Sequence, residues 1–162
     1  MFLYCELSSK VMTSPTISII AAMDEKGGIG KENKIPWHIR KDLVRLRDMT
    51  KDHVVVLGRN SYESMAGYYD KSGRPMPAKE YIVLTSNKDF TSSRNNTFAA
   101  TSIQEVFYKV EKSGEKEIFV IGGETIFKQM ISHTNKLYLT IVKGVFNCDT
   151  FFPDYSDFKK EI

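Results

Sequence analysis

The chain has 162 residues, of which 41% are hydrophobic and 27% are charged. A chain of this length and composition forms one globular domain with a substantial core, which excludes wholesale disorder. The formal net charge is only +3, and the basic residues are spread along the chain without a long run, so no nucleic-acid partner is indicated.

The first 15 residues are interpreted as an N-terminal extension rather than a signal peptide. Their opening apolar run is short, and Glu6 and Lys10 interrupt it. Met12 is an alternative start, and Pro15 stands just before the first predicted strand. No apolar run in the chain approaches the ~20 residues of a membrane span. We therefore expect a cytoplasmic protein without a membrane partner, whose single domain spans residues 16–162.

Strand-like and helix-like segments alternate through that domain. Segments rich in Val, Ile, Tyr and Thr predict strands at 16–23, 53–58, 80–86, 97–99, 117–122 and 136–142. Apolar spacing predicts helices at 39–50, 60–66, 102–112 and 124–133, the third opened by a capping box of Ser102 and Glu105. Residues 67–77 are expected as a surface loop. Strands separated by helices imply crossovers, so we expect an α/β fold with a mostly parallel sheet flanked by about four helices.

Three predicted strands end in residues that suit phosphate groups. Gly122 and Gly123 follow an apolar strand and open a helix, where backbone N–H groups can bind an anion. Residues 58–61, Gly-Arg-Asn-Ser, repeat this arrangement with a cation, and Thr85 and Ser86 add hydroxyls. Together these strand ends favour a nucleotide with several phosphates. A tight turn that needs glycine explains Gly122 and Gly123 equally well, and no full G-x-G-x-x-G fingerprint is present.

A single acid, Asp42, stands in a basic helix shortly after Trp37. It precedes Leu43 by one position and Leu46 by four, so it can share the apolar face of that helix. A partly desolvated carboxylate suits proton transfer and can bind the polar edge of a flat heterocycle, with Thr140 steadying it through its hydroxyl. The alternative is an exposed acid paired with a neighbouring arginine.

No arrangement for nucleophilic or metal chemistry accompanies this acid. The three histidines have no ligand spacing, and Cys5 and Cys148 have neither metal spacing nor an obvious partner, which indicates reduced thiols. We therefore expect no metal site. The pattern indicates that a bound cofactor supplies the difficult chemistry.

From residue 16 onward the chain resembles the dihydrofolate reductase family. The resemblance rests on short motifs in family order: Ile20-Ala21-Ala22, Gly28-Ile29-Gly30, Ile35-Pro36-Trp37, Asp42-Leu43, Gly58-Arg59, Gly73-Arg74-Pro75-Met76-Pro77, Val120-Ile121-Gly122-Gly123, Leu137-Tyr138-Leu139-Thr140 and Asp149-Thr150-Phe151-Phe152-Pro153. It implies reduction of 7,8-dihydrofolate to tetrahydrofolate by hydride transfer from NADPH. A monomer that binds this small-molecule substrate is the simplest expectation.

The resemblance also implies roles for individual residues. Asp42 would hold the pterin and promote protonation at N5, Thr140 would support it, and Trp37 would position a water. Residues 25–34 would form a mobile loop over the nicotinamide. The substrate pocket would be lined by Ile20, Ala22, Leu43, Leu46, Met65 and Ile121, with Lys79 at the substrate's carboxylate. Cofactor contacts would come from Ala22, Ile29, Gly30, Gly58, Arg59, Asn60, Ser61, Thr85, Ser86, Gly122, Gly123, Glu124, Thr125 and Phe127.

Three features depart from the family pattern. Lys79 stands where the family has arginine, and an ammonium group cannot make the same two-pronged contact with a carboxylate. A lengthened loop at 66–72 is expected to reshape the substrate entrance. The sequence stops at Ile162, before the pair of strands that completes the family's sheet, so we expect a C-terminally incomplete domain with an unpaired edge.

Two alternatives stay open at this point. The NADPH reductase of riboflavin synthesis shares the fold but acts on a phosphoribosylamino-pyrimidine, and the pairing of Pro36-Trp37 with Asp42-Leu43 favours the folate reaction over it. An inactive relative that binds the nucleotide without turnover is the second alternative, and Lys79 and the missing strands are its supports.

Overall fold

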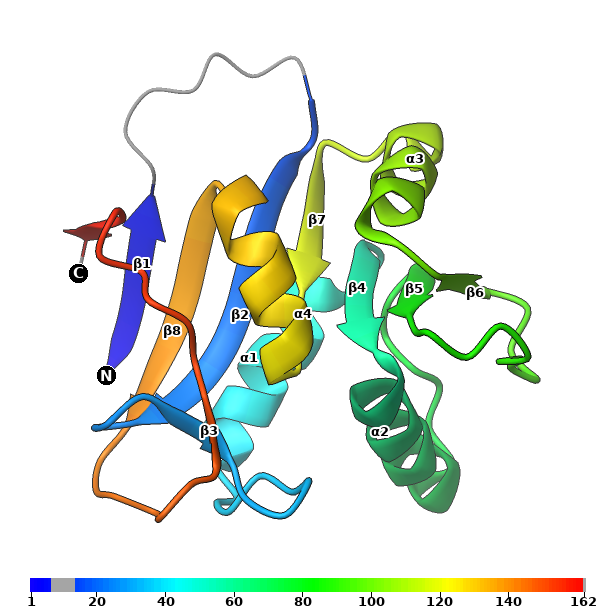
Figure 1. Ribbon diagram of the computed structural model, residues 1–162. Helices are drawn as coiled ribbons and strands as arrows, with labels where there is room; N and C mark the ends of the chain where they lie inside the picture. Colours follow the sequence, from blue (N-terminus) through cyan, green and yellow to red (C-terminus); the bar gives the residue numbers. More distant parts are fainter. Residues whose placement is uncertain (7–13, 162) are drawn as a thin grey trace.

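The computed structural model describes residues 1–6 and 14–161. The strands of its main sheet are β1 (Phe2–Glu6), β2 (Thr16–Asp24), β4 (Val54–Gly58), β5 (Glu80–Leu84), β6 (Thr97–Ala100), β7 (Glu117–Val120), β8 (Lys136–Val142) and β10 (Lys159–Glu161). They lie in the order β10-β1-β8-β2-β7-β4-β5-β6 (Figure 1). A separate two-stranded sheet pairs β3 (Gly28–Gly30) with β9 (Thr150–Phe151).

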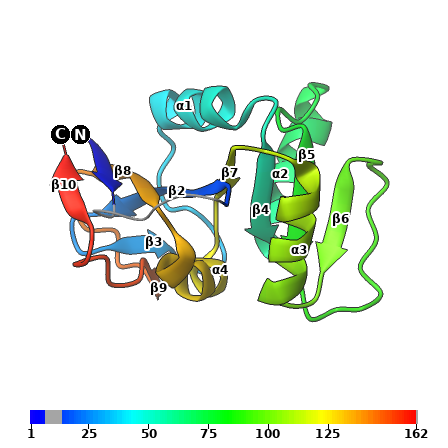
Figure 2. The same ribbon diagram turned by 90° about the horizontal axis from the view of Figure 1, so that it is seen from above.

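Helices cover both faces of the main sheet. They are α1 (Arg40–Thr50), α2 (Arg59–Ser72), α3 (Ile103–Ser113) and α4 (Glu124–Met130), the last continued by a 3-10 turn (Ile131–His133). Figure 2 shows α1 and α4 on opposite sides of the sheet. All neighbours from β8 to β6 in the sheet order pair in parallel, and only β1 introduces antiparallel pairs. The predicted mostly parallel sheet with four flanking helices is confirmed.

The apolar runs of the central strands reflect this double covering. In β4, Val54 and Val56 join the core cluster that contains α3 and α4. The alternate residues Val55 and Leu57 join a second cluster with α1 and α2. Because successive side chains of a strand point to opposite faces, a strand covered on both faces is apolar throughout rather than at every second position.

The capping box at the start of α3 is present. Ser102 is the N-cap, and its hydroxyl oxygen accepts a hydrogen bond from the Glu105 N–H at 3.1 Å. The Glu105 carboxylate in turn accepts from the Thr101 N–H at 2.7 Å. The first bond satisfies a backbone donor that the helix start leaves unpaired, and the second, one residue before the N-cap, fixes the chain that enters the helix.

The predicted loop at residues 66–72 is wrong, because α2 continues to Ser72. A glycine inside a helix costs only about 0.5–1 kcal/mol, so Gly67 weakens the helix without ending it. Buried Tyr62 and Ala66 anchor the helix on the sheet. The helix ends at Gly73, whose φ of 64° is left-handed, and the surface loop therefore begins there rather than at residue 67.

Residues 2–6, expected to lie outside the domain, form β1 within the main sheet. β1 runs antiparallel to β8, with Phe2 opposite Thr140, and β10 pairs with its other side. Leu3 and Cys5 are buried in the core. The edge of β8 that we expected to be unpaired is therefore covered. The rest of the expected extension, including Met12, lies largely outside the described residues.

Over residues 1–6 and 14–161, the structure contains no helix with the length and apolar character needed to cross a membrane.

Replacing Gly67 with alanine tests the corrected course of α2. An added Cβ would meet nothing within 4 Å, so Gly67→Ala should raise the free energy of unfolding by about 0.5–1 kcal/mol through reduced backbone entropy of the unfolded chain. The matched control is Gly73→Ala, which should lower it by about 1 kcal/mol because its φ is left-handed. Urea denaturation measures both, and a destabilised Gly67→Ala would contradict a helix at this position.

Candidate active site

Asp42 lies in the first turn of α1 and faces the end of β8. Thr140 Oγ1 donates a hydrogen bond to Asp42 Oδ1 at 2.5 Å, and Thr140 is buried. The parallel register of β2 and β8 places Thr140 beside Ala22. The predicted contact between Thr140 and Asp42 is therefore present. Among the described residues Asp42 forms no ion pair with an arginine, so the alternative of a simple surface pair is not what the structure contains.

Arg45, one turn after Asp42, reaches the same hydroxyl. Its Nη1 donates to Thr140 Oγ1 at 3.3 Å. Burial, the largest influence, lowers the pKa of Arg45, while the charge of Asp42 acts to raise it. The site thus holds one carboxylate and one partly desolvated cation, joined through a single hydroxyl.

An apolar surface from several elements accompanies this polar centre. Ile20 of β2, which is buried, belongs to the core cluster under α1 and α2, and Leu46, Met65 and Ile121 pack against it. Leu43 is exposed on α1. Four of the predicted pocket residues therefore share one apolar cluster that contains α1, the helix that carries Asp42.

Asp24, at the end of β2, organises the loops beside the site, although the sequence did not single it out. Its buried carboxylate accepts hydrogen bonds from the N–H groups of Gly28 (2.8 Å), Lys26 (2.9 Å) and Phe146 (3.0 Å). Burial, the largest influence, acts to raise the pKa of Asp24, but these three donors outweigh it and the pKa lies below its usual value. An aspartate directly before a glycine-rich turn is the sequence pattern that predicts such backbone bonds.

The predicted mobile loop, residues 25–34, is held by the segment that follows β8. Gly28 and Gly30 pair with Phe151 and Thr150 across β3 and β9. A Cβ on Gly28 would lie 2.5 Å from the Cβ of Cys148, so only glycine permits this approach.

Further contacts extend this hold to both sides of the loop. The Glu32 N–H donates to Asp149 Oδ2 at 2.8 Å. Trp37 packs edge-on against Phe146, with ring centroids 5.1 Å apart. The segment after β8 therefore positions both the loop and the predicted water-holding aromatic residue.

The predicted phosphate-binding strand ends meet at one edge of the sheet. The Gly58 N–H donates to the Gly122 carbonyl at 2.8 Å. A Cβ on Gly123 would lie 3.6 Å from Ser61 Oγ, and the peptide between Gly122 and Gly123 is cis. Helices α2 and α4 begin here, directly after their N-cap residues Gly58 and Gly123, without a side-chain cap. Unlike α3, they leave N–H groups open to an anion.

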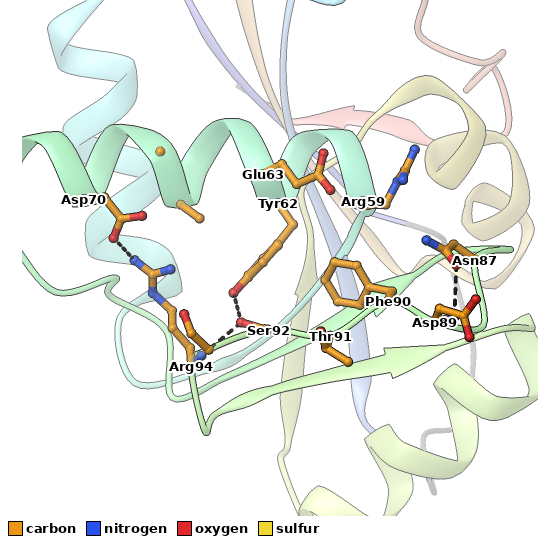
Figure 3. A pocket seen from close by; sticks show the side chains of 13 residues that line it. Arg59, Tyr62, Glu63, Asp70, Asn87, Asp89, Phe90, Thr91, Ser92 and Arg94 are labelled. Carbon is orange, nitrogen blue, oxygen red and sulfur yellow. Dashed lines mark hydrogen bonds and ion pairs between the residues drawn. The ribbon is translucent and has the colours of Figure 1, made fainter.

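A polar cavity of about 500 Å³ lies between α2 and residues 87–94 (Figure 3). At one end Arg94 pairs with Asp70 at 2.5 Å. At the other end lies Arg59, which is exposed and forms no ion pair within the part of the chain that the structure describes. Thr85 is buried and its hydroxyl accepts from the Asn87 N–H at 3.1 Å. Arg59 is therefore a cation at this edge that can meet an anionic ligand.

Asn60, Ser86 and Thr125, also predicted to contact the cofactor, are exposed at the same strand ends.

Three predicted cofactor residues have other partners in the structure. Glu124 accepts from the Phe151 N–H at 3.1 Å, which lowers its pKa, and lies 3.1 Å from Lys128 Nζ. Phe127 is buried against Phe152 and lies under Gly122. Ile29 packs against the same core. These residues brace the loop and the glycine pair, and their contact with a cofactor stays a prediction.

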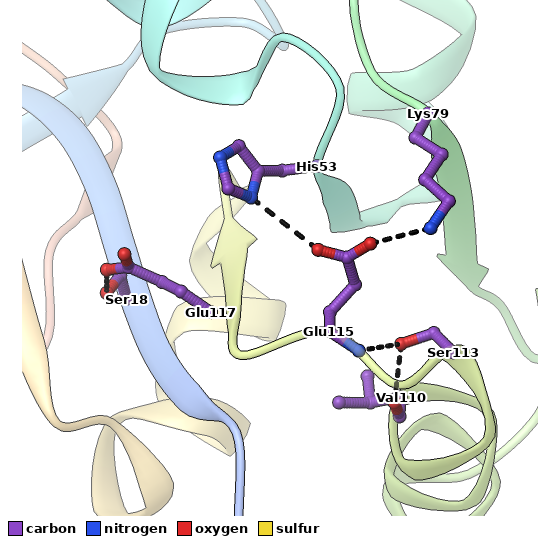
Figure 4. A network of polar contacts seen from close by, with 7 residues as sticks. All are labelled: Ser18, His53, Lys79, Val110, Ser113, Glu115 and Glu117. Carbon is purple, nitrogen blue, oxygen red and sulfur yellow. Dashed lines mark hydrogen bonds and ion pairs between the residues drawn. The ribbon is translucent and has the colours of Figure 1, made fainter.

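Lys79, predicted at the substrate's carboxylate, is engaged in a polar network just before β5 (Figure 4). Its Nζ lies 2.7 Å from Glu115 Oε1, and His53 Nδ1 lies 3.7 Å from the other carboxylate oxygen. The hydrogen bond to Glu115 raises the pKa of Lys79. A substrate carboxylate would therefore share this ammonium group with Glu115.

Comparisons with known proteins identify relatives of this chain. The family model described as dihydrofolate reductase matches residues 16–161. Dihydrofolate reductase of Staphylococcus aureus is 34% identical over 141 residues, covering 87% of this chain and 80% of the relative. That of Staphylococcus haemolyticus is 37% identical over 146 residues, covering 89% and 81%. A solved structure of dihydrofolate reductase from Enterococcus faecalis, complexed with NADP(H) and RAB-propyl, superposes with a TM-score of 0.73 at 35% identity, covering 87% of this chain and 79% of the other.

Replacing Asp24 with asparagine should loosen both loops, because the amide NH₂ that replaces one oxygen cannot accept from a backbone N–H. We expect the free energy of unfolding at pH 7 to fall by about 1–3 kcal/mol. The folded-state pKa of Asp24 is lowered, so its contribution is fully present above about pH 4 and is lost as the pH falls further. The gap between the parent and Asp24→Asn should therefore narrow below pH 4.

Urea denaturation at several pH values measures this gap. Asp157→Asn, which changes an exposed carboxylate, is the control and should leave the stability within about 0.5 kcal/mol of the parent. Equal stability of Asp24→Asn and the parent at pH 7 would contradict the role assigned to Asp24.

Proposed function

The chain belongs to the dihydrofolate reductase family, and from this premise we propose how its site works. It is an NADPH-dependent oxidoreductase that reduces 7,8-dihydrofolate to 5,6,7,8-tetrahydrofolate. The observation that carries the assignment of the site is the hydrogen bond of buried Thr140 to Asp42, which fixes a single carboxylate beside the apolar cluster of Ile20 and Leu46.

Asp42 binds the polar edge of the pterin and promotes its protonation. The two oxygens of a carboxylate accept hydrogen bonds from adjacent N–H groups of a flat heterocycle, and Thr140 fixes the rotation of the carboxylate by donating to one of them. The proton goes to N5 of the substrate while the hydride is added to C6, so the double bond between these atoms becomes single. Trp37, held by Phe146, positions a water near N5.

The strand ends at the carboxyl edge of the sheet fit the cofactor. Gly122 and Gly123 let the backbone approach a pyrophosphate, and the uncapped starts of α2 and α4 offer N–H groups to it. Arg59, with the hydroxyls of Ser61 and Thr85, binds the adenosine end and its extra phosphate, which selects NADPH over NADH. When bound, NADPH supplies the hydride.

The loop of residues 25–34 closes over the reacting groups and excludes water. Two residue pairs join β3 to β9, and the Glu32 N–H adds one bond to Asp149, so opening the loop breaks few bonds. The anchor at Asp24 stays in place because it belongs to β2.

The relatives reported above favour the folate reaction over that of the riboflavin-pathway reductase, since each of them is named a dihydrofolate reductase. A monomer is the simplest assembly that we propose for this chain. Within residues 1–6 and 14–161, Cys5 and Cys148 form no disulfide, which supports a reducing compartment such as the cytoplasm.

Asp42→Asn should remove most of the turnover of dihydrofolate near neutral pH. Its amide cannot support proton transfer, so we expect kcat to fall by at least about 100-fold, with NADPH binding unchanged. Loss of NADPH absorbance measures turnover. The matched control is Asp48→Asn on the same helix, whose carboxylate pairs with exposed Arg47, and it should keep the parent rate. Parent-like turnover in Asp42→Asn would contradict the assignment, and absence of turnover in the parent would favour the inactive relative.

Lys79→Arg should lower the Michaelis constant for dihydrofolate by about 3- to 10-fold. A guanidinium group can hold Glu115 and the substrate's carboxylate together through separate N–H groups, which an ammonium does less well. Steady-state kinetics measure this, with Lys71→Arg, at an exposed position in the last turn of α2, as the control. A dihydropterin without the glutamate tail should show no difference between parent and variant. An unchanged constant for dihydrofolate would count against a role of Lys79 in substrate binding.

A further inference from the structure

Strand β1 precedes the matched residues 16–161, yet it reaches the proposed active site. In Figure 1 it lies directly beside β8. Five residue pairs join the two strands, and the Met1 carbonyl accepts from the Ile141 N–H at 3.1 Å. Leu3 and Cys5 are buried, so apolar burial as well as backbone bonds fixes the register of β1 against β8.

This register places Phe2 next to Thr140. The two residues are directly opposite each other in an antiparallel pair, and such side chains share one face of the sheet. That face carries α1, because Thr140 bonds to Asp42 there. The first residues of the chain thus stand beside the hydroxyl that holds the proposed catalytic acid.

The guanidinium group of Arg45 lies over the ring of Phe2. The Arg45 guanidinium carbon lies 4.5 Å from the centroid of Phe2 and 5.9 Å from that of Tyr138. Both are cation–π distances, and Phe2 is much the nearer ring. Arg45 has no carboxylate ion pair among the described residues, so these two rings and Thr140 are the contacts that define its position.

The hydrogen bond from Arg45 favours donation of the Thr140 hydroxyl proton to Asp42. A threonine hydroxyl has one proton and two lone pairs, whereas a guanidinium group donates only. Since Arg45 Nη1 donates to Thr140 Oγ1 at 3.3 Å, the hydroxyl proton is left for Asp42, to which it points at 2.5 Å. Without Arg45 this second restraint on the rotation of the hydroxyl is lost.

We propose that Arg45 is a positioning residue of the active site, which acts on Asp42 through Thr140, and that β1 holds Arg45 in place through Phe2. This inference rests on the proposed function of Asp42. Strand β1, which precedes the residues that match the family, then both covers the sheet edge and helps to position the active site.

Four variants separate a positioning role from a purely structural one. Arg45→Met removes the charge and keeps the length of the side chain, and Arg45→Lys keeps the charge. Phe2→Ala removes the ring at a position that is 48% exposed, so it should fold. Cys5→Ala is the matched control, because Cys5 lies on the same strand but in the core cluster of the opposite face.

We expect kcat for dihydrofolate to fall about tenfold in Arg45→Met, the value of one hydrogen bond to a charged group, and about threefold in Phe2→Ala. The Kd for NADPH should not change in either. Arg45→Lys should recover part of the loss. Cys5→Ala should lower the urea midpoint and keep the parent kcat. The double variant Phe2→Ala with Arg45→Met should be no slower than Arg45→Met, because the ring acts only through the guanidinium.

Parent-like kcat in Arg45→Met, or losses that multiply in the double variant, would overturn the positioning role. In an Asp42→Asn background, Arg45→Met should have no further effect, and a further loss there would also overturn it. If Arg45→Met does not fold, a kcat loss confined to Phe2→Ala supports the proposal and an equal loss in Cys5→Ala overturns it. Parent-like turnover in Asp42→Asn alone would instead overturn the proposed function.

Discussion

The shared carboxyl edge of the parallel strands is the constraint on which the site depends. Because β2, β4, β7 and β8 all run in one direction, their ends deliver side chains and glycine turns to the same place. The acid is not on this sheet at all. It comes from α1 and is joined to the edge by one bond to Thr140. The sheet therefore fixes the cofactor side of the site through backbone geometry and the substrate side through a single side-chain contact.

The buried charge of Asp24 is compensated by hydrogen-bond partners. Asp24 is almost fully buried but accepts three backbone N–H groups, so its desolvation is compensated without a cation. Because those donors come from both loops beside the site, one carboxylate determines where each loop starts. The rest of the loop is held by the short pairing of β3 with β9 and by the bond from the Glu32 N–H to Asp149. A firm base with a weakly held tip is what a closing loop needs, since opening then breaks few bonds.

The features that the sequence predicted well are those encoded locally. Helical spacing identified the four α-helices found in residues 1–6 and 14–161, and the apolar runs identified the central strands, because period and composition are properties of neighbouring residues. Gly67 was overvalued as a helix breaker because its small local cost is exceeded by the packing of α2 on the sheet. The local bonds of Asp24 to Lys26 and Gly28 follow a recognisable turn pattern, but its link to the second loop and the place of β1 were missed for a different reason. The partners of both include residues more than 100 positions away, Phe146 for Asp24 and Thr140 for Phe2, and no local pattern records such pairs.

Because β1 covers the edge of β8, it is an integral strand of the domain and not an appended extension. A parallel strand at the end of a sheet exposes unpaired N–H and C=O groups, which invite association with other chains. An antiparallel strand of five residues removes that hazard on β8, and its alternation puts Leu3 and Cys5 into one core while Phe2 and Tyr4 face the other side. Without β1, the partly desolvated cation of Arg45 would keep its contacts to Tyr138 and Thr140 but lose its nearest aromatic ring, Phe2. The same five residues thus cover the edge of β8 and bury Leu3 and Cys5 on one face of the sheet, while Phe2 supports the Arg45 cation on the other face. Protection of the sheet edge and the geometry around Asp42 are therefore coupled through one strand.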